Sequence, residues 1–203
     1  MTKSQHGTLT ALGLAILACV FLLAVGCGEN PSGMIASGGN GADPSAIQYV
    51  YDNYGDPFST DTQNADAGLT PLAKHFKFKV DGDSALIGAS GGTLELQMRG
   101  FKSSLKIPKE ALSSDVMITA EGVLVTTPFS EVLLYDFGPD GLVFNLPTEL
   151  EVDAGQLENG TPFSLFWWNP VSESWEFQQE VLVKHHKLAF EVHHFSKYGI
   201  AAR

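Results

Sequence analysis

Cysteine is nearly absent from this chain of 203 residues, which contains only Cys19 and Cys27. No cysteine follows Cys27, so no disulfide can form within the rest of the chain. A zinc site built from several thiolates is excluded there for the same reason. A folded region after Cys27 must therefore be stabilised by an ordinary apolar core.

Positive charge is also scarce in this chain. Lys and Arg number 12 against 23 Asp and Glu, which gives a net charge of −11 at pH 7. The phosphate backbone of DNA or RNA repels a protein of this charge. The composition therefore predicts that nucleic acid is not a partner.

Long apolar runs are missing, and the one candidate for a membrane segment is short. Leu9–Val25 carries no charge, follows Lys3 and ends just before Cys27. The small residues before this cysteine resemble the bacterial lipobox, although Ala24 stands where that pattern most often has Leu. The resemblance implies that residues 1–26 are a lipoprotein signal peptide and that the thiol of Cys27 is acylated.

Two other interpretations of this segment stay open: lipidation at Cys19, and an uncleaved membrane anchor. With an acylated Cys27, the chain is expected in the cell envelope, with the lipid bilayer as the partner of that cysteine. Gly28 follows Cys27, whereas an Asp there would resemble an inner-membrane retention signal. The outer membrane is therefore favoured if the cell has two membranes.

Residues 27–71 have the composition of a flexible tether. Gly, Ser, Asn, Asp, Ala and Pro dominate, and such a segment buries too little apolar surface to offset the entropy of ordering. The aromatic-rich stretch Ile47–Tyr54 interrupts this pattern. It is consistent with an added edge strand, with docking on the domain, or with a plain linker.

Residues 72–203 show the all-β pattern of short apolar runs separated by turn signals. Apolar and polar residues alternate in Thr93–Met98 and in Leu188–Val192, which is typical of strands with one face in a core. We predict a single antiparallel β-sandwich, with a turn at Pro108–Leu112 as its only helical fragment. The strands expected are Phe76–Val80, Thr93–Met98, Ser104–Ile107, Val116–Val125, Leu134–Phe137, Val143–Phe144, Thr148–Val152, Phe163–Asn169, Trp175–Lys184, Lys187–His194 and Tyr198–Ala202.

Four motifs follow one another in this region. They are Gly91-Gly92-Thr93-Leu94, then Leu105–Leu112 with Val116–Thr119, then Phe137–Phe144 with Pro147, and finally His194–Gly199. In this order they resemble the motifs of the ZU-five domain, a β-sandwich found in ankyrins and netrin receptors. The resemblance covers about residues 86–202 and implies a sandwich that binds or scaffolds partners without catalysing a reaction.

The last motif also carries a possible chemistry. The family resemblance implies a self-cleavage reaction, because in some members the chain cuts itself at a His-Phe-Ser sequence by an N→O acyl shift. The hydroxyl of Ser196 would attack the carbonyl of Phe195, with His194 as the matching histidine and His186 or His193 as other candidate bases. The alternative is a core residue followed by a turn residue. Self-cleavage is therefore a second hypothesis for this chain.

A third hypothesis concerns sugars, because aromatic rings exposed on a sheet can stack on a glycan. Trp168 and Trp175 are the candidates for such a platform. No cofactor motif is present. At most one histidine of each pair, at 185–186 and 193–194, can join a shared metal site, since neighbours on a strand point to opposite faces. Such a site would also need an acid such as Glu180 or Glu191. Calcium at Asp81 and Asp83, or at Asp136 and Asp140, lacks the spacing of a known calcium loop.

The sequence thus predicts a lipid-anchored envelope protein whose β-sandwich binds another protein or an envelope component. No metal and no cofactor are expected.

Overall fold

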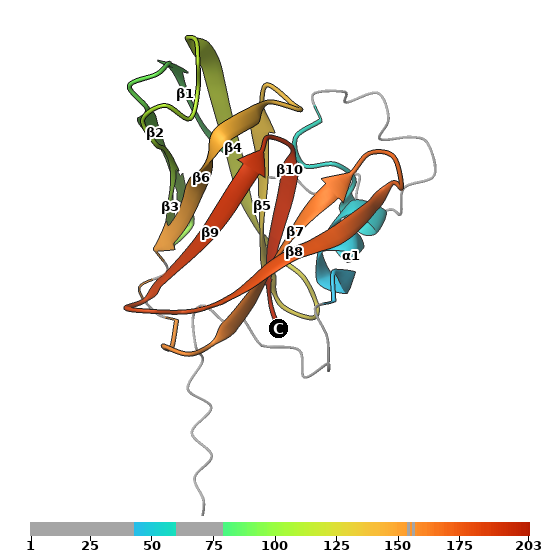
Figure 1. The fold of residues 1–203 in the computed structure, drawn as a ribbon. Coiled ribbons are helices and arrows are strands. Elements are labelled where there is room, and N and C mark those ends of the chain that lie inside the picture. Colours follow the sequence, from blue (N-terminus) through green and yellow to red (C-terminus); the bar gives the residue numbers. More distant parts are fainter. Residues whose placement is uncertain (1–42, 60–78, 154, 156) are drawn as a thin grey trace, which may run out of the picture. The chain divides into compact units, whose positions relative to one another are not determined.

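The computed structural model describes residues 43–59, 79–153, 155 and 157–203, which all belong to one unit of the chain. In this part of the chain, two antiparallel sheets pack face to face as a β-sandwich, which confirms the predicted fold class (Figure 1). The elements are α1 (Ser45–Tyr54), β1 (Asp81–Ile87), β2 (Gly92–Met98), β3 (Phe101–Ile107), β4 (Val116–Thr126), β5 (Glu131–Gly138), β6 (Val143–Asp153), β7 (Pro162–Asn169), β8 (Ser174–Leu182), β9 (Lys187–His194) and β10 (Lys197–Ala202).

Sheet A contains six strands in the order β1-β4-β5-β10-β7-β8, and sheet B four in the order β2-β3-β6-β9. Every pair of neighbouring strands is antiparallel. The chain crosses between the sheets from β1 to β2, from β3 to β4, from β5 to β6, from β6 to β7, from β8 to β9 and from β9 to β10. Sequence-distant strands therefore become neighbours, as in Greek-key sandwiches.

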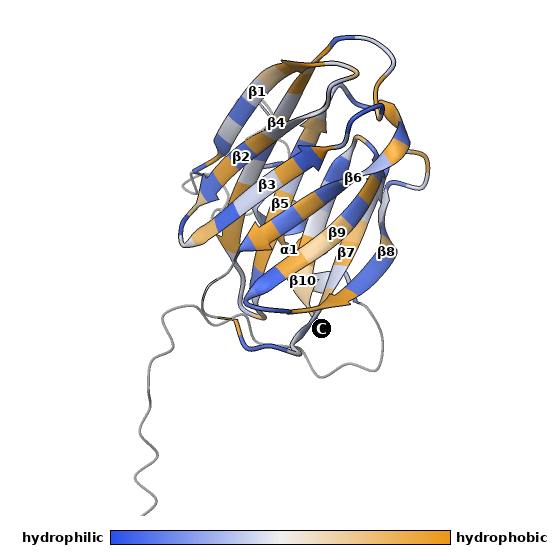
Figure 2. Ribbon diagram, turned by 60° about the vertical axis from the view of Figure 1, so that its left-hand side comes forward, coloured by the Kyte–Doolittle hydropathy of each residue, from blue (hydrophilic) through white to orange (hydrophobic). Residues whose placement is uncertain are grey.

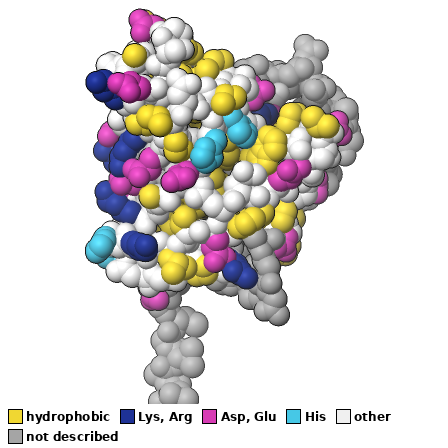
Figure 3. Space-filling model, in the orientation of Figure 1, with side chains coloured by type: hydrophobic (Ala, Val, Ile, Leu, Met, Phe, Trp, Pro, Cys, Tyr) yellow, Lys and Arg dark blue, Asp and Glu magenta, His cyan; other side chains and the backbone are white. Residues whose placement is uncertain are grey.

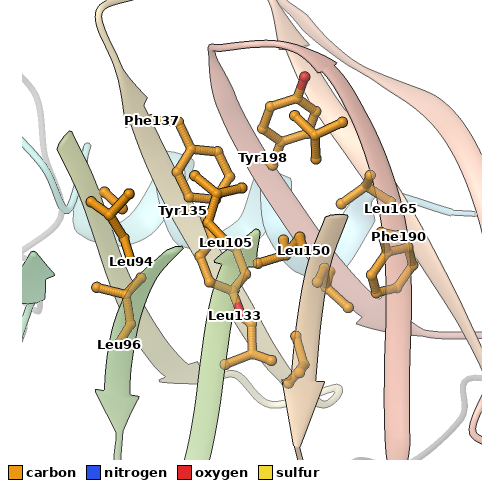
Figure 4. Packing of buried hydrophobic residues seen from close by; sticks show 14 of the residues in the cluster. Leu94, Leu96, Leu105, Leu133, Tyr135, Phe137, Leu150, Leu165, Phe190 and Tyr198 are labelled. Carbon is orange, nitrogen blue, oxygen red and sulfur yellow. The ribbon is translucent and has the colours of Figure 1, made fainter. Parts of the chain in front are cut away.

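The core between the sheets follows from alternation along the strands. In β2 the residues Leu94, Leu96 and Met98 are buried while their neighbours are exposed, and β9 shows the same period of two. Figure 2 shows this alternation as bands of colour along β2, β3, β6 and β9. Figure 4 shows Leu94, Leu105 and the other labelled side chains of the two sheets filling the space between them.

One buried polar contact lies inside this core. Tyr135 of β5 is fully buried, and its hydroxyl lies 2.7 Å from the hydroxyl of Ser103 on β3. Burial raises the pKa of Tyr135, so the phenol stays protonated. The pair satisfies two buried hydroxyls and links the two sheets.

Side chains from sheet A also satisfy the backbone along both edges of sheet B. On one side, the carboxylates of Asp81 and Asp83 accept hydrogen bonds from the N–H groups of Gln97 and Glu95. On the other, the Gln179 amide donates to the carbonyl oxygen of Glu191 at 2.7 Å. An open edge can pair with another chain, and these contacts occupy part of each edge.

Helix α1 packs on the outer face of sheet A and forms a second, smaller core (Figure 1). Ile47 and Val50 are fully buried there against Val123, Leu134 and other residues of the sheet. Gly199 of β10 permits the approach, because a Cβ at this position would lie 2.6 Å from Cδ1 of Ile47. The helix is thus part of the folded unit.

The structure differs from the sequence prediction at the N-terminal side. Residues 43–59 lie within the predicted tether but contain a helix that docks on the domain; docking was one of the three alternatives for Ile47–Tyr54, and the helical conformation was not expected. The strand expected at Phe76–Val80 lies mostly outside the described residues, and its described part is not a strand; β1 follows it instead. The two strands expected at Val143–Phe144 and Thr148–Val152 are one strand, β6, with an irregularity between Val143 and Thr148.

Candidate functional site

The four motifs that carry the family resemblance meet at one end of the sandwich, which we call the distal end. They lie at the β1–β2, β3–β4, β5–β6 and β9–β10 connections. Backbone hydrogen bonds join these connections: Glu110 N–H donates to Ala89 O at 2.9 Å, and Asn145 N–H donates to Ala111 O at 3.0 Å. The first role of the motifs is therefore structural, because they close this end of the core.

Phe195 sits at the centre of the distal end and is fully buried. Its ring packs on Phe144 and Phe137, with centroid distances of 4.7 and 5.5 Å. Its N–H donates to Leu142 O at 2.8 Å, and its carbonyl accepts from Gly141 N–H at 2.9 Å. The backbone of Phe195 is therefore held by the β5–β6 turn at both its N–H and its carbonyl.

The Ser196 hydroxyl and the His194 ring have different partners. The hydroxyl lies 3.4 Å from the carbonyl oxygen of Trp168, whereas the imidazole packs edge-on against Trp167 at 4.9 Å between centroids. In the described part of the chain, no histidine nitrogen hydrogen-bonds to the Ser196 hydroxyl. The structure thus places a donor on the Phe195 carbonyl but does not pair the serine with a base.

Tyr198 lies next to the same histidine. Its hydroxyl donates to the carbonyl oxygen of His194 at 2.7 Å and lies 3.4 Å from Nδ1 of the ring. Burial raises the pKa of Tyr198, and the nearby carboxylate of Asp140 raises it further. Tyr198 is therefore a neutral hydrogen-bond donor that positions the His194 backbone, and it is not a base.

Helix α1 packs against the two indoles on which the glycan hypothesis depends, so Trp175 is buried and Trp168 is partly buried. Trp175 is 6% exposed, and the ring of Tyr51 stacks on Trp168 with an interplanar angle of 6°. Tyr51 also contacts Trp175 at 5.3 Å between centroids. Trp168 and Trp175 follow the alternation of β7 and β8 onto the outer face of sheet A, and that face is closed by the helix.

A polar contact that the sequence did not predict holds the segment after α1 against sheet A. Lys197 of β10 forms an ion pair with Asp56, and Asp136 of β5 pairs with Lys197 in the strand register. Burial raises the pKa of Asp136, Lys197 lowers it, and the carboxylate of Asp56 raises it again. No motif marks these residues, since they are far apart in the sequence and the fold alone brings them together.

Within residues 43–59, 79–153, 155 and 157–203, no three histidine, cysteine or acidic side chains converge as metal ligands. The Nδ1 atom of His186 lies 2.9 Å from the carbonyl oxygen of Leu157, and both His185 and His186 adopt positive φ in the β8–β9 turn. The carboxylates of Asp81 and Asp83, which were considered above as calcium ligands, accept hydrogen bonds from backbone N–H groups of β2. These residues therefore stabilise turns and edges.

The outer face of sheet B is charged and open to solvent. Its lysines and glutamates form ion pairs across neighbouring strands, with N···O distances of 2.8 to 3.0 Å. Figure 3 shows several Lys and Arg side chains interspersed with Asp and Glu on the side of the molecule where β2 and β3 lie. The pairs are Lys102–Glu95, Lys106–Glu149, Lys106–Glu151 and Lys187–Glu151.

Cys27 and the segment before it lie outside the described residues. Among the helices of the described residues, none is both long enough and apolar enough to cross a membrane.

Comparison of the sequence with family models finds no match, and comparison with curated proteins finds none either. The ZU-five resemblance therefore depends on the four motifs alone.

Proposed function

We propose that this protein is a lipid-anchored component of the cell envelope whose sandwich binds another protein or an envelope component and is not catalytic. Residues 1–26 would be removed as a signal peptide, and Cys27 would carry the lipid. The observation behind the proposal is the uncharged run Leu9–Val25, which ends in small residues directly before Cys27. Several acyl chains on one cysteine make anchoring effectively permanent, because each buried methylene contributes about 0.8 kcal/mol.

The position of α1 limits how far the domain stands from such an anchor. Residues 28–42 separate Cys27 from the first described residue, Asp43. A fully extended chain spans about 3.5 Å per residue, so these residues reach at most roughly 50 Å. This is shorter than the reach expected from a tether that continues to residue 71. The proposed anchor therefore holds the domain close to the bilayer.

Binding, and not chemistry, is proposed for three reasons. The aromatic and motif residues are used in packing, as Phe195 and Trp175 show. The exposed polar groups include the paired charges on the outer face of sheet B, which suit recognition of a polar or charged partner. The ZU-five resemblance points to the same class, since its members mostly hold partners.

The test of the anchor compares two cysteine substitutions in cells fed an alkyne-tagged fatty acid. Cys27→Ser should abolish tagging of the protein and release it from the membrane fraction, while Cys19→Ser should leave both unchanged. Cys19 is a matched control because it lies in the same apolar segment. Tagging that persists in Cys27→Ser would refute the proposed site.

Self-cleavage between Phe195 and Ser196 is a second candidate function. The observation that favours it is the hydrogen bond from Gly141 N–H to the Phe195 carbonyl, the group that would become the oxyanion. The intact mass of the denatured protein tests it. Cleavage predicts a fragment ending at Phe195, which Ser196→Ala must abolish; an unbroken chain excludes the reaction.

A further inference from the structure

The end of the sandwich opposite the motifs, which we call the proximal end, is where α1 begins. Asp56 follows the helix and pairs with Lys197 at the distal side, whereas Tyr49 near its start packs on Phe129 of the β4–β5 loop, 5.5 Å between ring centroids. The C-terminus lies at this end too, since Arg203 N–H donates to Pro162 O at the start of β7. The β2–β3, β4–β5, β6–β7 and β8–β9 connections complete the proximal end, at the lower side of Figure 1.

A loop held by internal hydrogen bonds presents an apolar ring at the proximal end. Phe129 is 54% exposed. The buried hydroxyl of Thr127 accepts hydrogen bonds from the N–H groups of Phe129 and Ser130, and it donates a hydrogen bond to Ser130 O at 2.7 Å. The loop is thus held by its own hydrogen bonds, and this backbone conformation leaves the Phe129 ring about half exposed. Exposed aromatic rings at a loop tip suit the interface between water and lipid.

The two ends also differ in charge. The described segments that form the distal end (55–59, 88–91, 108–115, 139–142, 170–173 and 195–196) carry one cation, Lys109, and five acids. The proximal segments (43–44, 79–80, 99–100, 127–130, 155, 157–161, 183–186 and 203) carry four cations and two acids, and one of these cations, Arg203, is paired with Glu180 of β8. The distal acids are Asp56, Glu110, Asp115, Asp140 and Glu173; the proximal charges are Lys79, Arg99, Lys184, Arg203, Asp43 and Glu158. In a chain of net charge −11, the described loops of the proximal end are therefore less acidic than those of the distal end.

We propose that the proximal end docks on the surface of a bilayer that contains anionic phospholipid, with the ring of Phe129 in the interface and with Arg99 and Lys184 against headgroup phosphates. This inference rests on the proposed acylation of Cys27. The anchored chain would reach the domain at Asp43, on this same end, which keeps the end at a high effective concentration near the lipid. Each cation near an anionic surface adds attraction that salt screens.

A site-specific probe tests the orientation. In the acylated protein on vesicles of phosphatidylcholine and phosphatidylglycerol, a polarity-sensitive fluorophore is attached through Phe129→Cys; the matched control uses Val171→Cys, a position 92% exposed in the β7–β8 turn of the distal end. No native cysteine follows Cys27, whose thiol the lipid occupies, so labelling is specific. We expect the label at position 129 to brighten and to be quenched by nitroxide-bearing lipid, and the label at position 171 to remain in water. Equal signals from both labels would overturn the proposal.

Charge reversal tests the headgroup contact. Arg99→Glu or Lys184→Glu should lower the quenching at position 129 at least about fivefold, and Lys109→Glu at the distal end should leave it unchanged. An equal effect of all three reversals would contradict docking through the proximal end. Vesicles of phosphatidylcholine alone should give the weaker signal, and an unchanged signal there would refute anionic headgroups as the ligand.

A final experiment distinguishes failure of the proposed docking from failure of the proposed lipid anchor. If Cys27 is acylated and the label at position 129 stays in water, docking is wrong while the anchor stands. If Cys27 carries no lipid, the anchor is wrong, and flotation of the Cys27→Ser protein with the mixed vesicles then decides docking. If the Cys27→Ser protein floats with the vesicles and the further change Phe129→Ala lowers the floating fraction, the proposed docking surface is supported. If the Cys27→Ser protein does not float, the proposed docking surface is overturned.

Discussion

The outer face of sheet A carries valines and aromatic rings and lies under α1, whereas the outer face of sheet B carries paired lysines and glutamates in solvent. The strand sequences differ accordingly. In β10 the run Tyr198–Ala202 is buried on both faces, while β2 and β9 are buried at every second residue. A strand that is apolar at successive positions needs cover on both sides. In this protein the second cover is a ten-residue helix from the N-terminal side of the domain.

Ile47→Asp is expected to have the largest effect on stability, because it acts where α1 covers sheet A. Ile47 is fully buried between α1 and sheet A, and a carboxylate cannot be accommodated there without a partner. Because a short helix is unstable alone, α1 should detach. We expect a loss of about 3 kcal/mol in urea unfolding, a red shift of tryptophan emission as Trp168 and Trp175 become hydrated, and fast amide exchange across 45–54.

The control for this change is Asp52→Ala, on the exposed side of the same helix. It should alter the free energy of unfolding by less than about 0.5 kcal/mol. A protein with Ile47→Asp that unfolds and emits as the parent does would show that α1 contributes nothing to the fold.

Gly199→Ala should have the next largest effect. The added Cβ would lie 2.6 Å from Cδ1 of Ile47 and would push the helix from the sheet. Overpacking of this kind costs about 1–2 kcal/mol. Ile47→Val removes the Cδ1 atom, so the double variant should lose less than the sum of the two single changes. Strict additivity in this double-mutant cycle would contradict the close approach.

Tyr51→Phe is expected to change stability little, and in the favourable direction. The hydroxyl of Tyr51 is buried without a hydrogen-bond partner, and burial, with smaller contributions from the carboxylates of Asp56 and Asp136, raises its pKa. Removing an unsatisfied polar atom should gain between zero and about 1 kcal/mol. Urea unfolding measures this, and a clear loss of stability would show that the hydroxyl has a partner.

The smallest effect is expected on the open face of sheet B, at Glu151. Hydrogen bonds from Lys187 and Lys106 lower the pKa of this carboxyl group. A lowered pKa gives stability that is present above the unfolded value of about 4.3 and is lost as the pH falls through the folded value. Glu151→Gln should therefore cost less than about 1 kcal/mol at neutral pH, and nothing at a pH below the folded value. A cost that does not change with pH would exclude the ion pairs as its source.

Much of the sandwich could be predicted from the sequence because burial on one face imposes a period of two. The strand expected at Lys187–His194 has the bounds of β9, and the expected Thr93–Met98 differs from β2 by one residue. β1 was missed because Asp81-Gly82-Asp83 has the composition of a turn. The carboxylates of Asp81 and Asp83 accept hydrogen bonds from backbone N–H groups of β2. These contacts exist only in the folded protein, so the local sequence does not indicate them.

The helix had a signal that the prediction did not use. Ile47, Val50, Tyr51 and Tyr54 are spaced as one face of a helix, at i, i+3, i+4 and i+7. The surrounding Gly, Asp and Pro residues outweighed it. The covering of Trp168 and Trp175 followed from this helix and could not be derived from β7 and β8 alone.

The measurement that tests the proposed anchor most directly is the intact mass of the protein extracted from membranes. The account predicts a chain that begins at Cys27, with the added mass of a diacylglycerol group and, in many bacteria, one further acyl chain. A full-length chain beginning at Met1, or a mature chain with a free Cys27 thiol, would contradict it.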